Sequence, residues 1–502
     1  MKAAASWRLP FLPLELEKVS RVILSVVLGA GVFAFWMWLY PQALNYHEQN
    51  QLFLYTWDYF RERMALPGGF ADWCSEFLVQ FFRFRWSGAL VLAALAVLLQ
   101  LAVWKAAGCV NRQGSRSKYA LSFLPSLLML VHMGNMEVLV SYPVALLFSV
   151  FLCPLFAKAG WHRLWLIPLV WWLAGPVVVV PVLFSVLLGR KPADVVILVY
   201  TALVFYAGYR LLASQYPMRD AFFGINYTRI REMLPALQVI IPPVALLCVF
   251  LCGTGSRYRG ETVVDWIATV ILVLSTWGGV KHAYDKDSYE ILAYDWLIRQ
   301  ERYQEVVKRA EKYQPRDPVS ACSVNFCLFM TGQLESRMME FYQCGTKGLV
   351  RPSVRDNLSD ITSAELLWMM GMPNITLQYC FDMQESIQNG RRSGRFLSRM
   401  ADCNLVNGWY GPAEKYLDIL SHSLFYRKSA LRRKAMIGDD AAVNADPVYG
   451  YIRSVRFRDD FITVYDGLDL MMAILYNQNK NNFMAADYYS AWQRLKQMEV
   501  AP

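Results

Sequence analysis

Apolar runs long enough to cross a lipid bilayer fill the first half of the chain and constrain its fold more than any other feature. A helix needs roughly 20 apolar residues to cross the hydrocarbon core. About eight such runs can be recognised, covering residues 20–40, 87–107, 118–133, 138–157, 163–189, 193–214, 236–253 and 263–280. Because lipid offers the backbone no hydrogen-bond partners, such runs form helices. The sequence therefore predicts an all-α, polytopic transmembrane bundle over residues 1–283.

The fifth run, 163–189, is longer than the others and contains Pro168, Pro176 and Pro181. Both one tilted, kinked helix and two broken half-helices fit this pattern. The choice matters, because it decides on which side of the membrane the second half of the chain lies. The sequence leaves both possibilities open.

The composition indicates that a membrane bundle is joined to a water-soluble part. Of the 502 residues, 56% are hydrophobic and 18% are charged, which is too apolar for an ordinary soluble protein and too charged for a bundle alone. The net charge of +10 could indicate nucleic-acid binding. Much of the excess, however, lies in short loops between apolar runs, and no nucleic-acid recognition motif accompanies it. We therefore expect the lipid bilayer, and not nucleic acid, as a partner.

Basic residues in alternate loops predict the orientation of a multi-pass protein in the bacterial inner, cytoplasmic membrane. The first apolar run is too long for a signal-peptide core and ends in an aromatic belt, so it is expected to stay in the membrane. The positive-inside rule places the N-terminus in the cytoplasm and the loop 41–86 outside. An even number of spans then places the C-terminal domain in the cytoplasm. The basic loops at Arg190-Lys191 and at Arg257 to Arg259 would lie outside, against this rule.

The loop 41–86 is rich in aromatic residues and contains the first acidic side chains after the first span. A helix is expected from Asn45 or Asn50 to about Met64, and a second helix from near Asp72 after the break at Pro67-Gly68-Gly69. The expected face of the first helix comprises Glu48, Leu52, Tyr55 and Tyr59, and that of the second Phe70, Trp73, Phe77 and Phe81. Such aromatic stripes predict helices that lie at the headgroup level.

Residues 284–502 contain no strand pattern and divide into helix-turn-helix units. The expected pairs are 288–300 with 302–313, 319–330 with 334–343, 363–370 with 375–385, 393–406 with 412–420, and 465–476 with 483–498. Helix pairs with a Gly or Asn turn, at a pitch of about 35 residues, are typical of tetratricopeptide (TPR) repeats. The sequence thus predicts a TPR-like α-solenoid domain.

Three segments of the first loop resemble a family of uncharacterised integral membrane proteins from Bacteroidetes, namely Glu48 to Phe53, Pro67 to Gly69 and Phe77 to Phe82. The later stretch Leu405 to Tyr426 resembles the repeat region of the same family. This resemblance implies a bacterial inner-membrane protein and no particular substrate. The order of the spans and the position of the loop are also similar to those of GT-C membrane glycosyltransferases. That similarity implies an essential acid in the first external loop, and here the first acid after the span is Glu48.

Two hypotheses follow. In the first, the TPR-like domain is a scaffold whose groove binds a protein or peptide partner, and the chain is not an enzyme. In the second, the protein transfers a sugar from a polyprenyl-phosphate carrier. Glu48 or Asp58 would then act as general base, or hold a divalent metal against the phosphate, which is the only cofactor that this hypothesis requires.

Four further residues are candidates for substrate binding in the second hypothesis. His132 and Glu137 follow the third span, and Arg190 and Lys191 could bind a lipid phosphate from another loop. The ten cysteines have no metal-site spacing, and no nucleotide-binding loop or nucleophile elbow is present. The deciding observation is whether Glu48, Asp58, His132 and Glu137 converge on one cavity.

Overall fold

A computed structural model describes residues 14–111, 116–190, 192, 194–230, 232–254, 260–457 and 467–500. The chain forms two compact units. The bundle unit comprises Met1–Glu48 and Thr56–Asp285, and the hairpin unit comprises Gln49–Tyr55 and Lys286–Pro502. The described residues are helical, with two isolated β-bridges and no strands. The prediction of an all-α protein is therefore confirmed.

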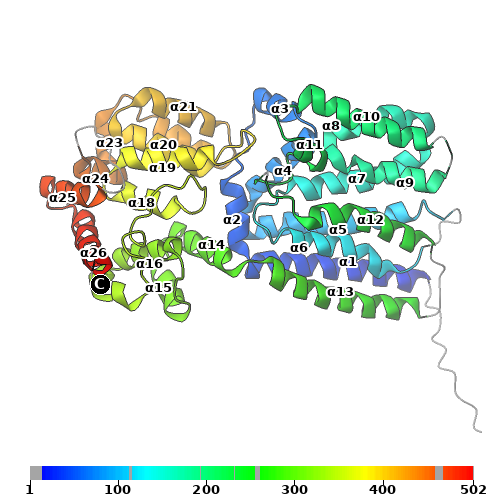
Figure 1. The fold of residues 1–502 in the computed structure, drawn as a ribbon, viewed down its shortest axis with the longest axis horizontal. Coiled ribbons are helices and arrows are strands. Elements are labelled where there is room, and N and C mark those ends of the chain that lie inside the picture. The colour runs from blue at the N-terminus through cyan, green and yellow to red at the C-terminus, as the bar shows by residue number, and fades with distance from the viewer. Residues whose placement is uncertain are drawn as a thin grey trace, which may run out of the picture. The chain divides into compact units, whose positions relative to one another are not determined.

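The bundle unit contains long apolar helices, as predicted. They are α1 (Leu14–Ala34), α5 (Arg85–Ala107), α6 (Leu124–His132), α7 (Ser141–Lys158), α8 (Arg163–Ala174), α9 (Val179–Gly189), α10 (Asp194–Leu212), α12 (Ala236–Thr254) and α13 (Glu261–Ala283) (Figure 1). Within the described part of the chain, seven apolar segments are long enough to cross a membrane, if Gly160–Gly189 is taken as one. These segments are compatible with a membrane protein.

One end of the bundle, which we call the N face, is where the chain enters α1. Here the guanidinium of Arg21 lies 5.0 Å from the ring of Trp104 at the end of α5 and 5.8 Å from that of Tyr119, just before α6. Arg21 also lies 3.7 Å from Glu261 at the start of α13. A buried hydrogen bond of 2.7 Å between Ser25 and Tyr119 fixes α1 against this end of the bundle.

The opposite end, which we call the loop face, is where α1 and α13 both finish. The rings of Tyr40, directly after α1, and Tyr284, directly after α13, lie 4.4 Å apart. Tyr284 also donates a hydrogen bond of 3.2 Å to the carbonyl of Leu130 near the end of α6. The chain therefore leaves the bundle for the hairpin unit, at Lys286, on the same face as the loop after α1.

The apolar run 163–189 is two half-helices that form a hairpin. Arg163 at the start of α8 donates to Ser185 near the end of α9, over 3.3 Å, and pairs with Asp194 at 3.1 Å. The turn between the halves, a 3-10 segment over Gly175–Val178, lies at the loop face, where Tyr227 donates to the carbonyl of Ala174 over 2.6 Å. Both ends of the run thus lie at the N face, and the ambiguity left by the three prolines is resolved.

The described helices consequently pass nine times between the two faces: α1, α5, α6, α7, α8, α9, α10, α12 and α13. The even number used for the orientation prediction counted α8 and α9 as one span. An odd number of passes agrees with the contact between Tyr40 and Tyr284, because the first and last of these helices then end at the same face. It also moves Arg190, at the end of α9, to the N face. Lys191, Arg257 and Arg259 lie outside the described residues.

The loop at the loop face contains three helices: α2 (Pro41–Gln49), α3 (Trp57–Met64) and α4 (Gly69–Val79). The single helix expected up to Met64 is wrong, because residues 51–55 are not helical and Thr56 caps a new helix by accepting from the amide of Tyr59. Glu48 and Tyr59 therefore do not share a helix face. The second helix begins at Gly69, earlier than expected, after Gly68 in the left-handed region at φ 80°.

The hairpin unit consists of short helices that pack against their neighbours along the chain. They are α14 (Lys286–Arg299), α15 (Tyr303–Lys312), α16 (Pro318–Met330), α17 (Leu334–Arg337), α18 (Ile361–Met369), α19 (Pro373–Glu385), α20 (Gly394–Asn407), α21 (Tyr410–Ser421), α22 (Arg427–Lys434), α23 (Asp440–Ala445), α24 (Pro447–Val455), α25 (Leu468–Gln478) and α26 (Phe483–Val500). Nine of them match helices of the expected pairs within a few residues, and α17, the tenth, is much shorter than the expected 334–343. Tyr488 of α26 packs on Phe329 of α16, with ring centroids 5.7 Å apart, so the last pair folds back on an earlier one.

A seven-residue segment of the first loop, Gln49–Tyr55, belongs to the hairpin unit. The amide of Leu52 donates to the carbonyl of Arg392 over 2.8 Å, and that of Tyr55 to the carbonyl of His422 over 2.9 Å. The side-chain oxygen of Gln49 accepts from Arg299 and Arg395 at 3.3 and 3.1 Å. The chain therefore passes between the two units three times, after Glu48, after Tyr55 and after Asp285.

Candidate functional site

Three buried residues and one half-buried residue meet at the loop face, and we call them the Arg229 cluster: Tyr46, His47 and Arg229 with the half-buried Glu137. Tyr46 and His47 lie on α2. Glu137 lies in the connector between α6 and α7, and Arg229 follows the short helix α11 (Met218–Phe223). The two connectors run side by side, because Leu139 donates to the carbonyl of Tyr227 over 2.8 Å and Arg229 to that of Glu137 over 2.7 Å. This backbone pairing holds Arg229 beside Glu137.

The guanidinium of Arg229 has unused hydrogen-bonding capacity. Its side chain is 3% exposed, and it lies 4.6 Å from the ring of Tyr46 and 3.8 Å from the carboxylate of Glu137. Tyr46 in turn donates to Glu137 over 3.2 Å. None of the three guanidinium nitrogens has a hydrogen-bond acceptor among the described residues. A buried charge is costly unless it is both paired and hydrogen-bonded, so Arg229 is suited to bind an anionic group.

His47 supplies a second polar group without hydrogen bonds. Its ring is 1% exposed, and neither ring nitrogen has a hydrogen-bond partner in the described part of the chain. Burial, and then the charge of Arg229, lower the pKa of His47 to about 3. The imidazole is therefore neutral at pH 7, with one nitrogen able to donate and the other able to accept.

Of the expected site residues, the structure places Glu137 in the Arg229 cluster and separates Asp58 from it. Glu137 is part of the Arg229 cluster, and Glu48, which follows His47 on α2, is also buried. His132 is buried at the end of α6, where its ring packs on Tyr142 with centroids 5.1 Å apart. Asp58 does not join them, because its side chain is 92% exposed on α3 and faces Arg61 at 3.6 Å.

Arg190 lies at the N face, at the end of α9, and is exposed. It is therefore at the opposite end of the bundle from His132 and Glu137. The loop that contains Arg190 was expected on the outer side, but it follows the α8–α9 hairpin and so begins at the N face. Lys191 lies outside the described residues. Arg190 thus cannot act with Glu137 on one phosphate group.

A separate buried ion pair joins the two helices α3 and α4. Arg63 donates to Glu76 over 2.8 Å, and Tyr59 donates a hydrogen bond to the same carboxylate. The guanidinium of Arg63 also lies 4.9 Å from the ring of Tyr59. Because these three groups satisfy one another, we assign them a structural role in holding the loop helices together.

Sequence reasoning missed Arg229 and His47 as site residues. Arg229 lies in the connector between the expected spans 193–214 and 236–253, which an even span count places in the cytoplasm, and His47 precedes the more obvious acid Glu48. Two signals were available in the sequence. Tyr46-His47-Glu48 groups three chemically active side chains directly after a span, and Arg229 lies in the loop that an odd count would put on the same face.

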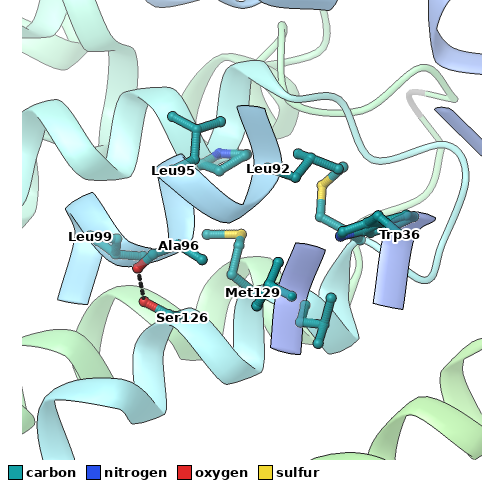
Figure 2. A pocket seen from close by; sticks show the side chains of 11 residues that line it. Trp36, Leu92, Leu95, Ala96, Leu99, Ser126 and Met129 are labelled. Atoms are coloured by element: carbon teal, nitrogen blue, oxygen red, sulfur yellow. Dashed lines mark hydrogen bonds between the residues drawn. The ribbon is translucent and has the colours of Figure 1, made fainter. Parts of the chain in front are cut away.

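A small cavity inside the bundle carries no comparable chemistry. It has a volume of about 30 Å³ and is lined by α1, α5 and α6 residues including Trp36, Leu92, Leu99 and Met129. Figure 2 shows that Ser126, a polar residue at its edge, already donates to the carbonyl of Ala96, over 2.7 Å. The cavity is therefore apolar and offers a ligand no polar anchor.

No group of three or more His, Cys, Asp or Glu residues suited to hold a metal ion occurs in the described ranges. The residues of the Arg229 cluster do not fit a divalent cation either, because they include one carboxylate and one cationic guanidinium.

The chain was compared with known protein families, curated proteins and solved structures. The model of a family of unknown function, DUF6057, matches residues 17–497. The chain belongs to this family. The match spans both units, so the bundle and the hairpin unit occur together in DUF6057 proteins. No curated protein and no solved structure matches the chain.

Proposed function

We propose that this DUF6057 protein is a multi-pass inner-membrane enzyme that binds a phosphate-bearing, lipid-linked sugar at the Arg229 cluster and transfers the sugar to an acceptor hydroxyl. The observation that carries the proposal is the buried guanidinium of Arg229, whose nitrogens lack acceptors in the described chain. A guanidinium binds phosphate oxygens through paired hydrogen bonds. The assignment of a polyprenyl-phosphate sugar rests on the similarity of the span order to GT-C enzymes.

The residues of the site can support the transfer of a sugar from a phosphate to an acceptor hydroxyl. The acceptor oxygen would form a bond to the anomeric carbon while the bond from that carbon to the phosphate oxygen breaks. The departing phosphate keeps the electron pair, and Arg229 stabilises its charge. The acceptor proton goes to the carboxylate of Glu48, the buried acid next to His47. Neutral His47 can donate one hydrogen bond to the phosphate.

Binding of polyprenyl phosphate to the purified full chain tests the proposal. We expect Arg229→Gln to weaken binding, measured by native mass spectrometry in detergent, by at least about tenfold, since charge-assisted hydrogen bonds to phosphate are lost. The matched control is Arg61→Gln, an exposed arginine of the loop after α1, and it should bind like the wild type. Glu48→Gln should keep binding and lose transfer. Unchanged binding by Arg229→Gln would overturn the proposal.

A second candidate function, a scaffold for protein partners, is favoured by the hairpin unit. This unit holds the segment Gln49–Tyr55, of which residues 51–55 are not helical, through two backbone hydrogen bonds, and the side chains of Leu52, Phe53 and Leu54 are buried. TPR-like domains bind peptides in this way, by combining apolar burial with a few polar anchors. This geometry supports the proposal that the hairpin unit has a surface suited to extended peptides. In this chain the surface holds the chain's own segment Gln49–Tyr55.

Crosslinking in cells separates the two functions. If the scaffold is correct, the double variant Arg395→Ala/Asp295→Ala, which breaks an ion pair of 2.8 Å in the hairpin unit, should lose crosslinked partners that Glu48→Ala retains. The reverse pattern, with a phenotype from Glu48→Ala only, would support the enzyme alone.

We propose that the N face is cytoplasmic and that the hairpin unit lies outside the cytoplasm. The positive-inside rule favours this orientation, because the described residues Arg116, Lys118, Lys158, Arg163 and Arg190 lie in or beside connectors at the N face. The earlier expectation of a cytoplasmic C-terminal domain depended on the even span count. With nine passes, the Arg229 cluster and the exit to the hairpin unit share the loop face.

A further inference from the structure

A groove on the side of the bundle runs along α1 and α5 and has a volume of about 750 Å³. Small residues open it, namely Gly29 and Ala30 on α1 and Ala93 and Ala94 on α5. Apolar side chains form the rest of its wall, among them Val26, Phe33, Leu90 and Val97. Ala30 and Ala94 are exposed, so the groove opens to the outside of the bundle. Its width and lining suit an acyl chain.

The N-face end of the same groove is cationic. Lys18, Arg21 and Arg116 line it, and none of its described lining residues is acidic. The guanidinium groups of Arg21 and Arg116 lie over the same ring, that of Trp104, at 5.0 and 4.6 Å. Glu17 and Glu261 approach Arg21 only to 3.8 and 3.7 Å, outside the groove.

Two observations indicate that an anion would stabilise this end. Arg21 approaches the carboxylates of Glu17 and Glu261 only to 3.8 and 3.7 Å, which is beyond hydrogen-bond distance, although its side chain is only 23% exposed. Burial, and then the nearby charge of Arg21, lower the pKa of Arg116. Two neighbouring cations repel each other, and a phosphate placed between them would turn that repulsion into attraction.

We propose that this groove binds one anionic phospholipid, with an acyl chain along α1 and α5 and the phosphate between Arg21 and Arg116. Basic pockets between helices at a cytoplasmic membrane surface recognise anionic headgroups in this way. The site is independent of the Arg229 cluster, because it lies at the opposite face of the bundle. The hydroxyl of Ser25, also in the groove, is already engaged with Gln100 and Tyr119, so the phosphate depends on the cationic side chains.

The test is native mass spectrometry of the full chain in detergent, titrated with dioleoylphosphatidylglycerol or with dioleoylphosphatidylcholine. We expect one phosphatidylglycerol to bind at least tenfold more tightly than phosphatidylcholine. The double variant Lys18→Gln/Arg21→Gln should remove that preference and leave phosphatidylcholine binding unchanged. Lys105→Gln is the matched control, because Lys105 lies at the same face on α5 but does not line the groove. Excess inorganic phosphate should not compete, which excludes a site for free phosphate.

A second pair of variants keeps the test valid if the charge variant does not fold. Ala94→Phe fills the exposed part of the groove and should weaken phosphatidylglycerol binding at least tenfold. Ala202→Phe on α10 places the same ring at another exposed site and should have no effect. Arg229→Gln should also have no effect, so failure of this proposal and failure of the proposed function can be told apart. Equal affinity for both lipids, or equal effects of Lys105→Gln and the charge variant, would overturn it.

Discussion

At the scale of single residues, the loop face contains two kinds of buried charge with different consequences. In the pair Arg63–Glu76 each charge meets a partner at hydrogen-bond distance. In the Arg229 cluster the guanidinium meets a carboxylate only at 3.8 Å. The first arrangement stabilises the fold as long as both Arg63 and Glu76 are present. The second leaves the N–H groups of Arg229 available to donate hydrogen bonds to a ligand.

The first prediction concerns the buried pair. Glu76→Gln should destabilise the protein by about 3–5 kcal/mol, because the buried charge of Arg63 loses its partner. The measurement is thermal unfolding in detergent. Asp58→Asn, on the exposed surface of the same loop, should change stability by less than about 0.5 kcal/mol. Equal effects of the two substitutions would contradict the structural role of Glu76.

The second prediction concerns the pH dependence that His47 causes. Its pKa is lowered to about 3 in the folded protein, whereas in the unfolded chain the pKa of a histidine is about 6.5. Below pH 6.5 the unfolded state therefore binds the extra proton, and stability falls as the pH falls. Between pH 7 and pH 5 this loss amounts to about 2 kcal/mol. His47→Asn should show a smaller fall over this range in thermal unfolding, and identical profiles would refute the assignment.

At the scale of elements, the α8–α9 hairpin decides the topology of the bundle. Its turn requires Gly175, which has φ 75° and ψ −153°, a region that only glycine readily adopts. A Cβ at this position would also lie 3.0 Å from the hydroxyl of Tyr227. The hairpin thus depends on one residue without a side chain, packed against the backbone of Gly68.

Gly175→Ala should therefore destabilise the protein by about 1–3 kcal/mol, from backbone strain alone. Gly31→Ala is the control, since a Cβ there would meet nothing within 4 Å, and it should not lower stability because alanine favours a helix. Both are measured as melting temperatures in detergent. A loss for Gly31→Ala as large as that for Gly175→Ala would argue against the hairpin turn.

At the scale of the whole molecule, the odd number of passes predicts that the two termini lie on opposite sides of the membrane. Reporter fusions that are active only outside the cytoplasm should be active after Pro502 and inactive in the connector after Arg190. The reason is that α13 ends before Tyr284 at the loop face, whereas α9 ends before Arg190 at the N face. Activity at Arg190 together with inactivity after Pro502 would restore the even count and refute the hairpin.

The sequence by itself determined the helical class, the positions of the apolar helices and nearly all helices of the hairpin unit. These features depend on local properties, namely apolar length, glycine turns and capping residues, which act within one or two turns of a helix. The aromatic helices of the first loop were also predictable, although Gln51 to Tyr55 interrupts the first of them because this segment pairs with the hairpin unit.

Only the tertiary structure decided the return of the chain at Gly175, the place of Gln49–Tyr55 and the composition of the Arg229 cluster. Each of these depends on residues far apart in the sequence, such as Gly68 with Gly175 or Glu137 with Arg229. Periodicity and propensity describe the neighbours of a residue along the chain, whereas these contacts arise when connectors from different helices meet at one face. The physical reason is that packing, and not local preference, selects between one kinked helix and two halves of equal apolarity.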